Sequence, residues 1–284
     1  MSGNAIEIRP MTLQDIDFGM ELKNLAGWNQ LPNDWQRMIG LTPEGCFIAT
    51  SEDTPVGTAT TINYEDKAGW IAMVLVDPEH RRKGIGSALL YACIDHLEQL
   101  VETVKLDATP MGKQLYDTLG FVDEYMMERW LGRGVSPTEV PGVRRITAEM
   151  LPAVCQFDLP VFGADRSRLL RAMVTEPANT PLCVVDDDQL VGYGIVRPGY
   201  HAWQIGPMVA TEPDVAQRLF RALLGVVGED HVYNDALMPN PHVLDLLRDF
   251  NFDKQRHLIR MYKGPNAYPG LPQYVYAASG PEKG

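Results

Sequence analysis

The 284-residue sequence predicts an α/β (α+β) fold, in which strands and helices alternate along the chain. Seven apolar residues in a row, at 70–76, indicate a strand that is buried on both faces of a sheet. The segment that follows, from Ser87, carries its apolar residues at the spacing of one helix face. The same order of segments recurs after residue 142, which indicates an internal duplication and therefore two domains.

The first half of the sequence predicts strands separated by polar turns, together with helices. The expected strands show alternating or continuous apolar character and lie at residues 6–9, 46–50, 56–64, 70–76 and 104–108. The expected helices show a capping signal, as at Thr12 with Asp15, or apolar residues three and four apart. They run from this capping signal toward Leu25, from 87 to 97 and from 111 to 119. Gly120 follows the last of them, where a glycine ends a helix favourably.

Residues 132–141 contain two glycines and two prolines without periodicity, so we predict an interdomain linker at 134–141. The predicted domains are therefore residues 1–133 and 142–284. The second domain repeats the order of the first, with elements expected at 142–146, from about 149, and at 182–185, 190–196, 203–210, 215–224 and 232–236. Residues 274–276 are expected to add a short strand.

The composition excludes several classes of protein. Lys and Arg number 25 against 37 Asp and Glu, and the net charge of -12 argues against a nucleic-acid partner, because an acidic chain repels phosphate backbones. Four cysteines are too few for a disulfide scaffold, and no His or Cys pair has metal-ligand spacing, so we expect no metal. We find no signal peptide and no long apolar run, and so expect a cytoplasmic protein without a membrane partner. The oligomeric state is left open.

One segment carries specific chemistry: a basic, glycine-containing loop between the buried strand and the next helix. Its sequence is Asp77-Pro-Glu-His-Arg81-Arg82-Lys83-Gly84-Ile85-Gly86-Ser87. The first N–H groups of a helix have no internal partners and lie at the positive end of its dipole. Glycines let a phosphate approach the main chain closely, and three cations add positive charge in an otherwise acidic chain. The loop therefore predicts a phosphate-binding site.

The nucleotide motifs GxxxxGK[ST] and GxGxxG are both absent from this loop. It contains Arg-x-x-Gly-x-Gly instead, and Leu115-Tyr116-Asp-Thr-Leu-Gly120-Phe121 follows at a distance. These two elements resemble the acyl-coenzyme A signature and the Leu-Tyr-x-x-x-Gly-Phe element of the GNAT N-acetyltransferase superfamily. In that superfamily the loop amides hold the pyrophosphate of the coenzyme.

Further segments resemble the YitH-type branch, in which a second, divergent GNAT-like domain follows the first. They are Ala26-Gly-Trp28-Asn29, residues 70–78, Lys105-Leu-Asp107-Ala-Thr109-Pro110 and Val161-Phe-Gly-Ala-Asp165-Arg166. The resemblance covers most of the chain and is strongest over residues 6–130. It implies tandem GNAT folds, each a central mixed, mostly antiparallel sheet flanked by helices. It also implies an N-acetyltransferase with acetyl-coenzyme A (acetyl-CoA) as co-substrate.

The resemblance assigns coenzyme binding to the main chain of the buried strand and to the loop, with an N–H near Val74 polarising the thioester. The residues so assigned are Val74, Leu75, Val76, Arg81, Arg82, Lys83, Gly84, Ile85, Gly86 and Ser87. Tyr116 matches the tyrosine proposed in many relatives to protonate the leaving thiolate. A phenol, with an ordinary pKa of about 10, can do so with modest help. The alternative for Tyr116 is aromatic packing beside Phe121.

The general base is left open by the sequence. Asp107 ends a strand at the carboxyl edge of the sheet, and Glu128 lies on a late strand where it can face the acceptor cleft. A structural carboxylate is the alternative at both positions. Trp28, Asn29 and Trp35 lie in the region that walls the acceptor pocket in this superfamily. The tryptophans can stack on an acceptor or hold a cation, with core packing as the alternative.

The second domain lacks the loop: Thr211-Glu-Pro-Asp follows its buried strand, and Leu247 stands where the first domain has Tyr116. We expect it to bind no coenzyme, and either to complete the acceptor site or to stabilise the first domain. The predicted function is acetyl transfer to the amine of a small-molecule acceptor. The alternatives are a catalytically weak acyl-CoA-binding sensor or regulatory pseudo-acetyltransferase and, more remotely, a protein acceptor.

Overall fold

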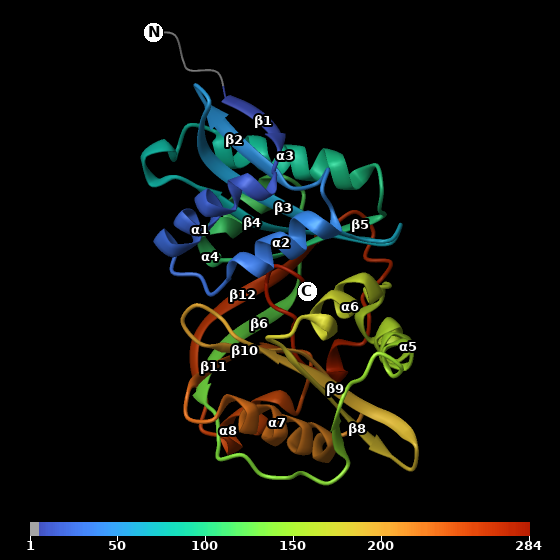
Figure 1. Ribbon diagram of the computed structural model, residues 1–284. Helices are drawn as coiled ribbons and strands as arrows, with labels where there is room; N and C mark the ends of the chain where they lie inside the picture. The colour runs from blue at the N-terminus through green and yellow to red at the C-terminus, as the bar shows by residue number, and fades with distance from the viewer. Residues whose placement is uncertain (1–5) are drawn as a thin grey trace. The chain divides into compact units, whose positions relative to one another are not determined.

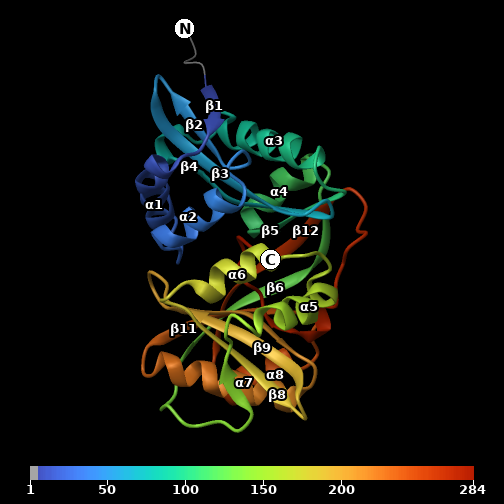
Figure 2. The ribbon, with the colours of Figure 1, turned by 45° about the vertical axis from the view of Figure 1, so that its right-hand side comes forward.

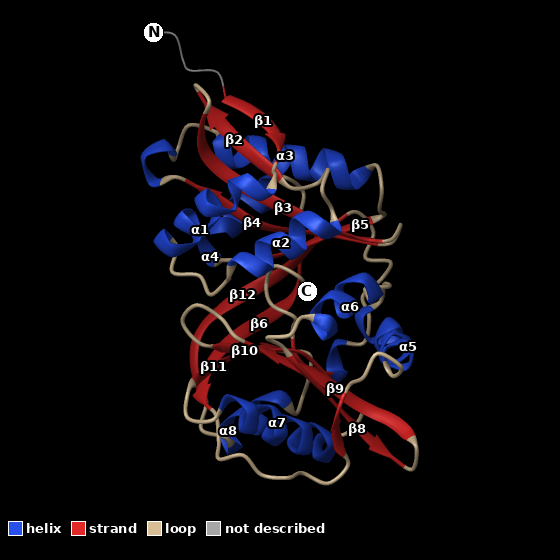
Figure 3. Ribbon diagram, viewed as in Figure 1, coloured by secondary structure: helices blue, strands red, loops and turns tan. Residues whose placement is uncertain are grey.

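The computed structural model describes residues 6–284, which divide into two compact units. Unit 1 holds the described residues up to Leu106 together with Tyr262–Ala267. Unit 2 holds Asp107–Met261 and Tyr268–Gly284. Both units contain strands with helices packed against them (Figure 3), which confirms the mixed α/β class predicted from the sequence.

The helices and strands follow one another in an order that occurs twice. Up to residue 133 they are β1 (Ile6–Pro10), η1 (Leu13–Asp15), α1 (Ile16–Leu25), α2 (Pro32–Leu41), β2 (Phe47–Ser51), β3 (Thr54–Tyr64), β4 (Ala68–Val76), η2 (Pro78–His80), α3 (Ile85–Glu98), β5 (Thr103–Ala108), α4 (Pro110–Thr118) and β6 (Val122–Arg133). Beyond residue 142 they are β7 (Val143–Arg145), α5 (Leu151–Phe162), α6 (Ser167–Thr175), β8 (Thr180–Asp186), β9 (Gln189–Arg197), β10 (Trp203–Ala210), α7 (Pro213–Val227), β11 (His231–Leu237), α8 (Val243–Asp249), β12 (Asp253–Lys263), η3 (Pro272–Tyr274) and β13 (Val275–Ala277). We call residues 6–133 the first repeat and residues 143–263 the second repeat, because β7 to β12 follow the order of β1 to β6.

In unit 1 the strands lie side by side in the order β1-β2-β3-β4-β5. The pairs β1–β2, β2–β3 and β3–β4 are antiparallel, and β4 and β5 are parallel. Helices α1 and α2 cover one face of this sheet and α3 covers the other (Figure 1). The strands predicted at 46–50 and 56–64, with a polar turn between them, are β2 and β3, which pair antiparallel as a hairpin.

Helix α2 is absent from the sequence predictions, although its start signals are present. Pro32 occupies the first helical position, and the Asp34 carboxylate accepts the N–H of Leu31 at 2.9 Å. Both features favour a helix start. Trp35 and Met38, three residues apart, are fully buried, as the apolar face of a helix requires.

The pairing of strand β4 with β3 is interrupted by an irregularity. Between the pairs Thr58–Leu75 and Thr60–Ala72, two residues of β4 oppose one residue of β3, which is a β-bulge. Met73 lies in this bulge with φ +52°, a left-handed conformation that side chains other than glycine rarely adopt. The bulge turns the main chain of β4 just before the strand ends.

Strands β4 and β5 pair only where they begin, from Ala68–Thr103 to Trp70–Lys105. Within the described part of the chain, no strand pairs with this side of β4 beyond Trp70. The main-chain groups of residues 71–76 therefore have no strand partner on that side.

In unit 2 the strands lie in the order β12-β6-β11-β10-β9-β8-β7, and β13 pairs with β10. Helices α7 and α8 cover one face of this sheet and α5 and α6 the other (Figure 2). Each face has its own apolar core, built on Leu219 and Phe220 from α7 and on Val154 and Leu170 from α5 and α6. Among residues 6–284, no helix has the length and apolar character needed to cross a bilayer.

The segment predicted as a linker, residues 134–141, contains no helix or strand and lies within unit 2. The N–H groups of Gly134 and Val135 donate to the carbonyls of Asp230 and Leu224, at 3.0 and 3.1 Å. The compact units thus divide the chain at other places than this linker, while the division into domains at 1–133 and 142–284 stays a prediction.

An exchange of strands explains the difference. Strand β6, the last of the first repeat, pairs antiparallel with β11 of the second repeat, from Met127–Leu237 to Arg133–His231. Strand β12, the last of the second repeat, lies beside β6, and its end belongs to unit 1. The last strand of the first repeat therefore completes a sheet built mainly by the second.

Two buried ion pairs fasten the exchanged strands. Asp107 accepts two hydrogen bonds of 2.9 Å from Arg260 of β12. Asp235 of β11 accepts bonds of 2.8 and 2.7 Å from Arg129 of β6. Residues Val232-Tyr-Asn-Asp235-Ala236 of the second repeat correspond to Val104-Lys-Leu-Asp107-Ala108 of the first. Each aspartate is the fourth residue of its segment, so the two pairs occupy equivalent places in the repeats. In both pairs the aspartate and the arginine come from different repeats.

Candidate functional site

The predicted phosphate loop, residues 77–87, spans the connection between β4 and α3 and the first three residues of α3 in unit 1. Arg81 Nε donates to the carbonyl of Val76 at 3.2 Å, which ties the loop to the end of the strand. Gly84 has φ +82° immediately before the helix, a conformation that favours glycine. Arg82 also has a positive φ of +60°, which is uncommon for a residue with a side chain. The loop thus has a defined, partly strained backbone.

The N–H groups of this loop are available to a ligand. The ladder of α3 begins where the Ala88 N–H donates to the Gly84 carbonyl at 3.0 Å. No main-chain carbonyl in residues 6–284 accepts the N–H groups of residues 82–87. A Cβ built on Gly86 would meet Val76 Cγ2 at 3.7 Å and no nearer atom, so the protein's own packing does not require glycine there. The space beside Gly86 is open to an external group.

The charges and the strand beside this loop fit a long anionic ligand. The side chains of Arg81, Arg82 and Lys83 are exposed in a chain of net charge -12. Exposed cations beside free N–H groups at a helix start attract phosphates. Residues 74–76 lead into the loop along the open side of β4, and Val74 and Val76 are half-buried. An extended polar chain can bond this edge as a further strand would.

The acceptor-site residues predicted in unit 1 divide into two kinds. Trp28 is half-buried and Asn29 is buried in the turn between α1 and α2, where Lys23 Nζ donates to the Trp28 carbonyl at 3.3 Å. Trp35 instead has no exposed surface, and a Cβ built on Gly19 would lie 3.0 Å from its ring. A ring packed this closely has no face for a ligand, so the structure favours core packing for Trp35.

Buried polar residues behind this turn were missed from the sequence. Asp34 Oδ1 and Arg37 Nη1 form an ion pair at 2.8 Å within α2, and both side chains are buried. Lys23 is fully buried, and burial lowers its pKa while Asp34 opposes that shift. The Asp34 and Arg37 spacing of three on a helix is the signal that was available. These contacts hold the turn that carries Trp28.

The predicted general acid, Tyr116, lies in α4 of unit 2 and is half-buried. Its ring makes an edge contact with Phe121, with centroids 6.0 Å apart. On another side, a Cβ built on Gly112 would lie 3.1 Å from Tyr116 Cε2. Packing on two sides fixes the ring and thereby positions the phenol oxygen.

Asp107, a candidate base, is committed to an ion pair. Its side chain has no exposed surface, and both carboxylate oxygens accept from Arg260, which also donates to the hydroxyl oxygen of Tyr125 at 2.9 Å. Burial raises the pKa of Asp107, and the charge of Arg260 opposes that rise. A base needs a free lone pair facing its substrate. The geometry favours the structural alternative for Asp107.

Glu128, the other candidate carboxylate, is also engaged. It is buried on β6, pairs with Lys254 of β12, and accepts the indole N–H of Trp130 at 3.2 Å. Lys254 and Arg260 were not predicted as partners. A signal for Arg260 was available: when Asn251-Phe252 is matched to Gly120-Phe121, Arg260 and Arg129 lie at the same distance after the matched residues.

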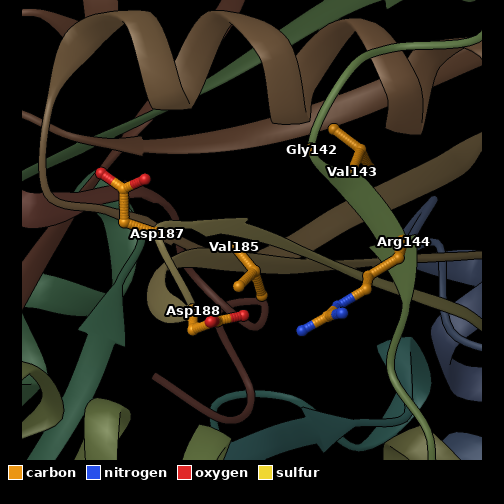
Figure 4. Close-up of a pocket in the computed structure, with 6 residues that line it drawn as sticks. All are labelled: Gly142, Val143, Arg144, Val185, Asp187 and Asp188. Carbon is orange, nitrogen blue, oxygen red and sulfur yellow. The ribbon is translucent and has the colours of Figure 1, made fainter.

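A separate small pocket lies in unit 2, beside the turn between β8 and β9 (Figure 4). Its volume is about 360 Å³, and its lining residues are Gly142, Val143, Arg144, Val185, Asp187 and Asp188. None of the predicted site residues lines it. Within residues 6–284, no cluster of three or more His, Cys, Asp or Glu side chains is placed to hold a metal ion.

Comparison with known proteins places both halves of the chain in one family. The profile of the Acetyltransferase (GNAT) family matches residues 14–121, and that of an Acetyltransferase (GNAT) domain matches residues 154–277. Holothin acyltransferase from Pseudoalteromonas sp. (strain SANK 73390) is 26% identical over 258 residues, covering 90% of this chain and 87% of that one. The uncharacterized N-acetyltransferase YitH from Bacillus subtilis (strain 168) is 29% identical over 159 residues, covering 54% and 55%.

A solved structure has the same fold over the full length. It is a putative acetyltransferase from Pyrococcus horikoshii, with a TM-score of 0.87 at 24% identity, covering 100% of this chain and 98% of that one. The two family matches fall on the two repeats, and relatives named as acyltransferases extend along the chain. The chain therefore belongs to the GNAT acetyltransferase superfamily and is an acyltransferase with two GNAT domains in tandem.

Proposed function

We propose that the chain transfers the acetyl group of acetyl-CoA directly to the amine of a small-molecule acceptor, with the coenzyme held by the first repeat. One observation carries the proposal: the cationic loop before α3, with unpaired N–H groups at residues 82–87 and open space beside Gly86. GNAT acetyltransferases use acyl-CoA. The diphosphate of the coenzyme is a ligand that such a helix start favours.

The open side of β4 extends the proposed site from the loop toward the reacting group. Main-chain groups of residues 74–76 have no strand partner on that side, so they can bond the amides of the pantetheine arm. The bulge at Met73 turns this part of the main chain. An N–H near Val74 would polarise the thioester carbonyl, as preorganised donors do for a developing oxyanion.

The proposed reaction is a direct transfer with balanced protons. The lone pair of a neutral amine attacks the thioester carbonyl carbon, the C–N bond forms and the C–S bond breaks. Tyr116 protonates the departing thiolate and regains a proton from solvent, while the nitrogen that forms the amide loses one proton to solvent or to a base. Asp107 and Glu128 are not assigned as that base, because Arg260 and Lys254 engage them.

The proposed acceptor is a compact amine that contacts the turn between α1 and α2. Trp28 supplies a half-buried aromatic surface there, and Lys23 holds its main chain. The relative from Pseudoalteromonas is named for acyl transfer to holothin. Its name supports a small-molecule acceptor over a protein acceptor. Asn29 is buried beside Trp28 and is proposed to position this wall rather than to stack on the acceptor.

The test is release of free thiol from acetyl-CoA in the presence of a panel of amines. The full chain is expected to release thiol with at least one amine well above the rate without acceptor. Mass spectrometry of that mixture must then show the acetylated amine. Coenzyme binding without turnover across the panel would favour the sensor, and acetylation of added peptides alone would favour a protein acceptor.

Replacing Tyr116 by phenylalanine is expected to lower kcat by about 100-fold, because general acids contribute roughly 10²–10⁴ to rate. The dissociation constant for acetyl-CoA is expected to stay within about twofold, since the ring and its contacts remain. Tyr91→Phe, which removes an exposed phenol from α3, is the matched control and should leave kcat unchanged. Equal kcat values for Tyr116→Phe and the parent chain would remove Tyr116 from the mechanism.

A further inference from the structure

The second repeat contains a gap between strands like that of the first, but the gap is filled. Strands β10 and β11 pair in parallel only over the first three residues of β10, up to Ile205–Asn234. Beyond that point β13 lies against β10, paired antiparallel at Met208 and Val209. In the first repeat the corresponding side of β4 has no strand partner within the described residues. The same gap is thus open in one repeat and occupied in the other.

Both walls of the gap bond the occupying strand. On the β11 side, Asn234 Nδ2 donates to the Tyr276 carbonyl at 3.0 Å, and the Ala278 N–H donates to the Asp235 carbonyl at 2.9 Å. Residues 275–279 are all buried. A segment bonded on both edges and hidden from solvent behaves as an added strand, the way an extended peptide binds an open sheet edge.

A single arginine clamps the segment that follows this strand. Arg166 is buried and donates to both carboxylate oxygens of Asp158, at 2.7 and 2.8 Å. The same guanidinium donates to Ser279 Oγ at 2.9 Å and to the Gly284 carbonyl at 3.2 Å. Tyr193 Oη donates to Asp158 at 2.5 Å, so the clamp is itself held from β9. Arg166 thus joins α5 to residues 279–284.

The second repeat also lacks the part that would hold a diphosphate. Residues 211–212 alone join β10 to α7, whereas residues 77–84 join β4 to α3. Glu212 stands at the N-cap of α7, where the first repeat has Gly84. A carboxylate there repels phosphate, so neither the loop nor the charge needed for the coenzyme is present.

We infer that residues 275–284 are the resident ligand of the second repeat. The gap that takes the coenzyme arm in the first repeat is a strand-binding cleft in the second, and the chain's own segment closes it. One chain therefore binds a single acetyl-CoA, at the first repeat; this count rests on the proposed function. The second repeat binds this segment of its own chain in place of a coenzyme, and its gap admits no second coenzyme.

The first experiment combines titration calorimetry and hydrogen exchange on the full chain. We expect one acetyl-CoA per chain, affinity lowered by about 100-fold or more in Gly86→Glu, and unchanged amide exchange at residues 275–279 when acetyl-CoA is saturating. Two coenzymes per chain, or faster exchange at 275–279 on binding, would overturn the inference. One coenzyme that still binds Gly86→Glu with parental affinity, with exchange at 275–279 unchanged, would overturn the proposed function alone.

The second experiment loosens the clamp. Arg166→Met is expected to raise exchange at residues 275–279 by about tenfold or more, because local opening free energies set exchange rates. The coenzyme count is expected to stay at one. Ser279→Ala removes a single hydrogen bond of Arg166 and should raise exchange in the same residues to a smaller extent. It replaces Arg166→Met as the test variant if Arg166→Met does not fold. Asp245→Ala breaks an exposed pair elsewhere in unit 2 and is the control. Exchange at 275–279 unchanged in the folded variants, or a second coenzyme bound by them, would overturn the inference.

Discussion

Replacing Gly86 by glutamate is expected to weaken acetyl-CoA binding by about 100-fold or more, because placing like charges together costs several kcal/mol and each 1.4 kcal/mol is a factor of ten. The new carboxylate would stand beside the unpaired N–H groups of residues 82–87, where the diphosphate is proposed to lie. The chain itself should tolerate the change, since the nearest atom to a Cβ at this position is Val76 Cγ2, at 3.7 Å. Titration calorimetry measures the loss.

Two control variants at the same position separate charge from bulk. Gly86→Gln has nearly the size of glutamate without its charge and is expected to lose less affinity than Gly86→Glu. Gly86→Ala makes only an ordinary contact with Val76 and should keep the melting temperature of the parent chain. A folded Gly86→Glu variant that binds acetyl-CoA with parental affinity would exclude the loop as the coenzyme site.

Removing Asp107 is expected to lower the free energy of unfolding by about 3–5 kcal/mol, the usual cost of leaving a buried charge without its partner. Asp107→Ala takes away the two carboxylate hydrogen bonds that the buried guanidinium of Arg260 donates. Asp235→Ala should lower the free energy of unfolding by a comparable amount, because Arg129 loses both carboxylate hydrogen bonds at the equivalent place of the other repeat. Chemical denaturation of each variant measures the change.

The pattern among variants distinguishes a structural carboxylate from a catalytic one. The double variant Asp107→Ala, Arg260→Met is expected to be more stable than Asp107→Ala alone, since no unpaired charge remains buried. Asp245→Ala, which breaks an exposed pair, should change stability by less than about 0.5 kcal/mol. An Asp107→Ala variant with parental stability and a large loss of kcat would make Asp107 the base after all.

Local sequence signals predicted most of the elements and the candidate coenzyme loop. The apolar run at 70–76, the basic loop and the helical spacing after Ser87 correspond to β4, residues 77–84 and α3. The strand predicted at 274–276 is β13. Each of these signals lies within a few residues of the feature it predicts, so no tertiary information was needed. The start signals of α2 were equally local and were overlooked.

Partners far apart in the sequence required the structure. Apolar periodicity shows that a strand faces a core, but it does not show which neighbouring strand completes the sheet. The sequence therefore did not reveal that β6 pairs with β11, or that Asp107 and Glu128 are held by arginine and lysine from β12. Burial of Trp35 likewise depends on the packing of α1 against α2.

The sequence by itself determined the kind of protein: a tandem α/β chain with a basic, glycine-containing loop after a buried strand, because charge, glycine and periodicity are properties of contiguous residues. Only the tertiary structure decided what fills the two equivalent gaps. Strand β13 lies against β10, whereas no strand among residues 6–284 pairs with the corresponding side of β4 beyond Trp70. The physical reason is that a strand finds its partner through main-chain hydrogen bonds, which every sequence can form and which no side-chain pattern records.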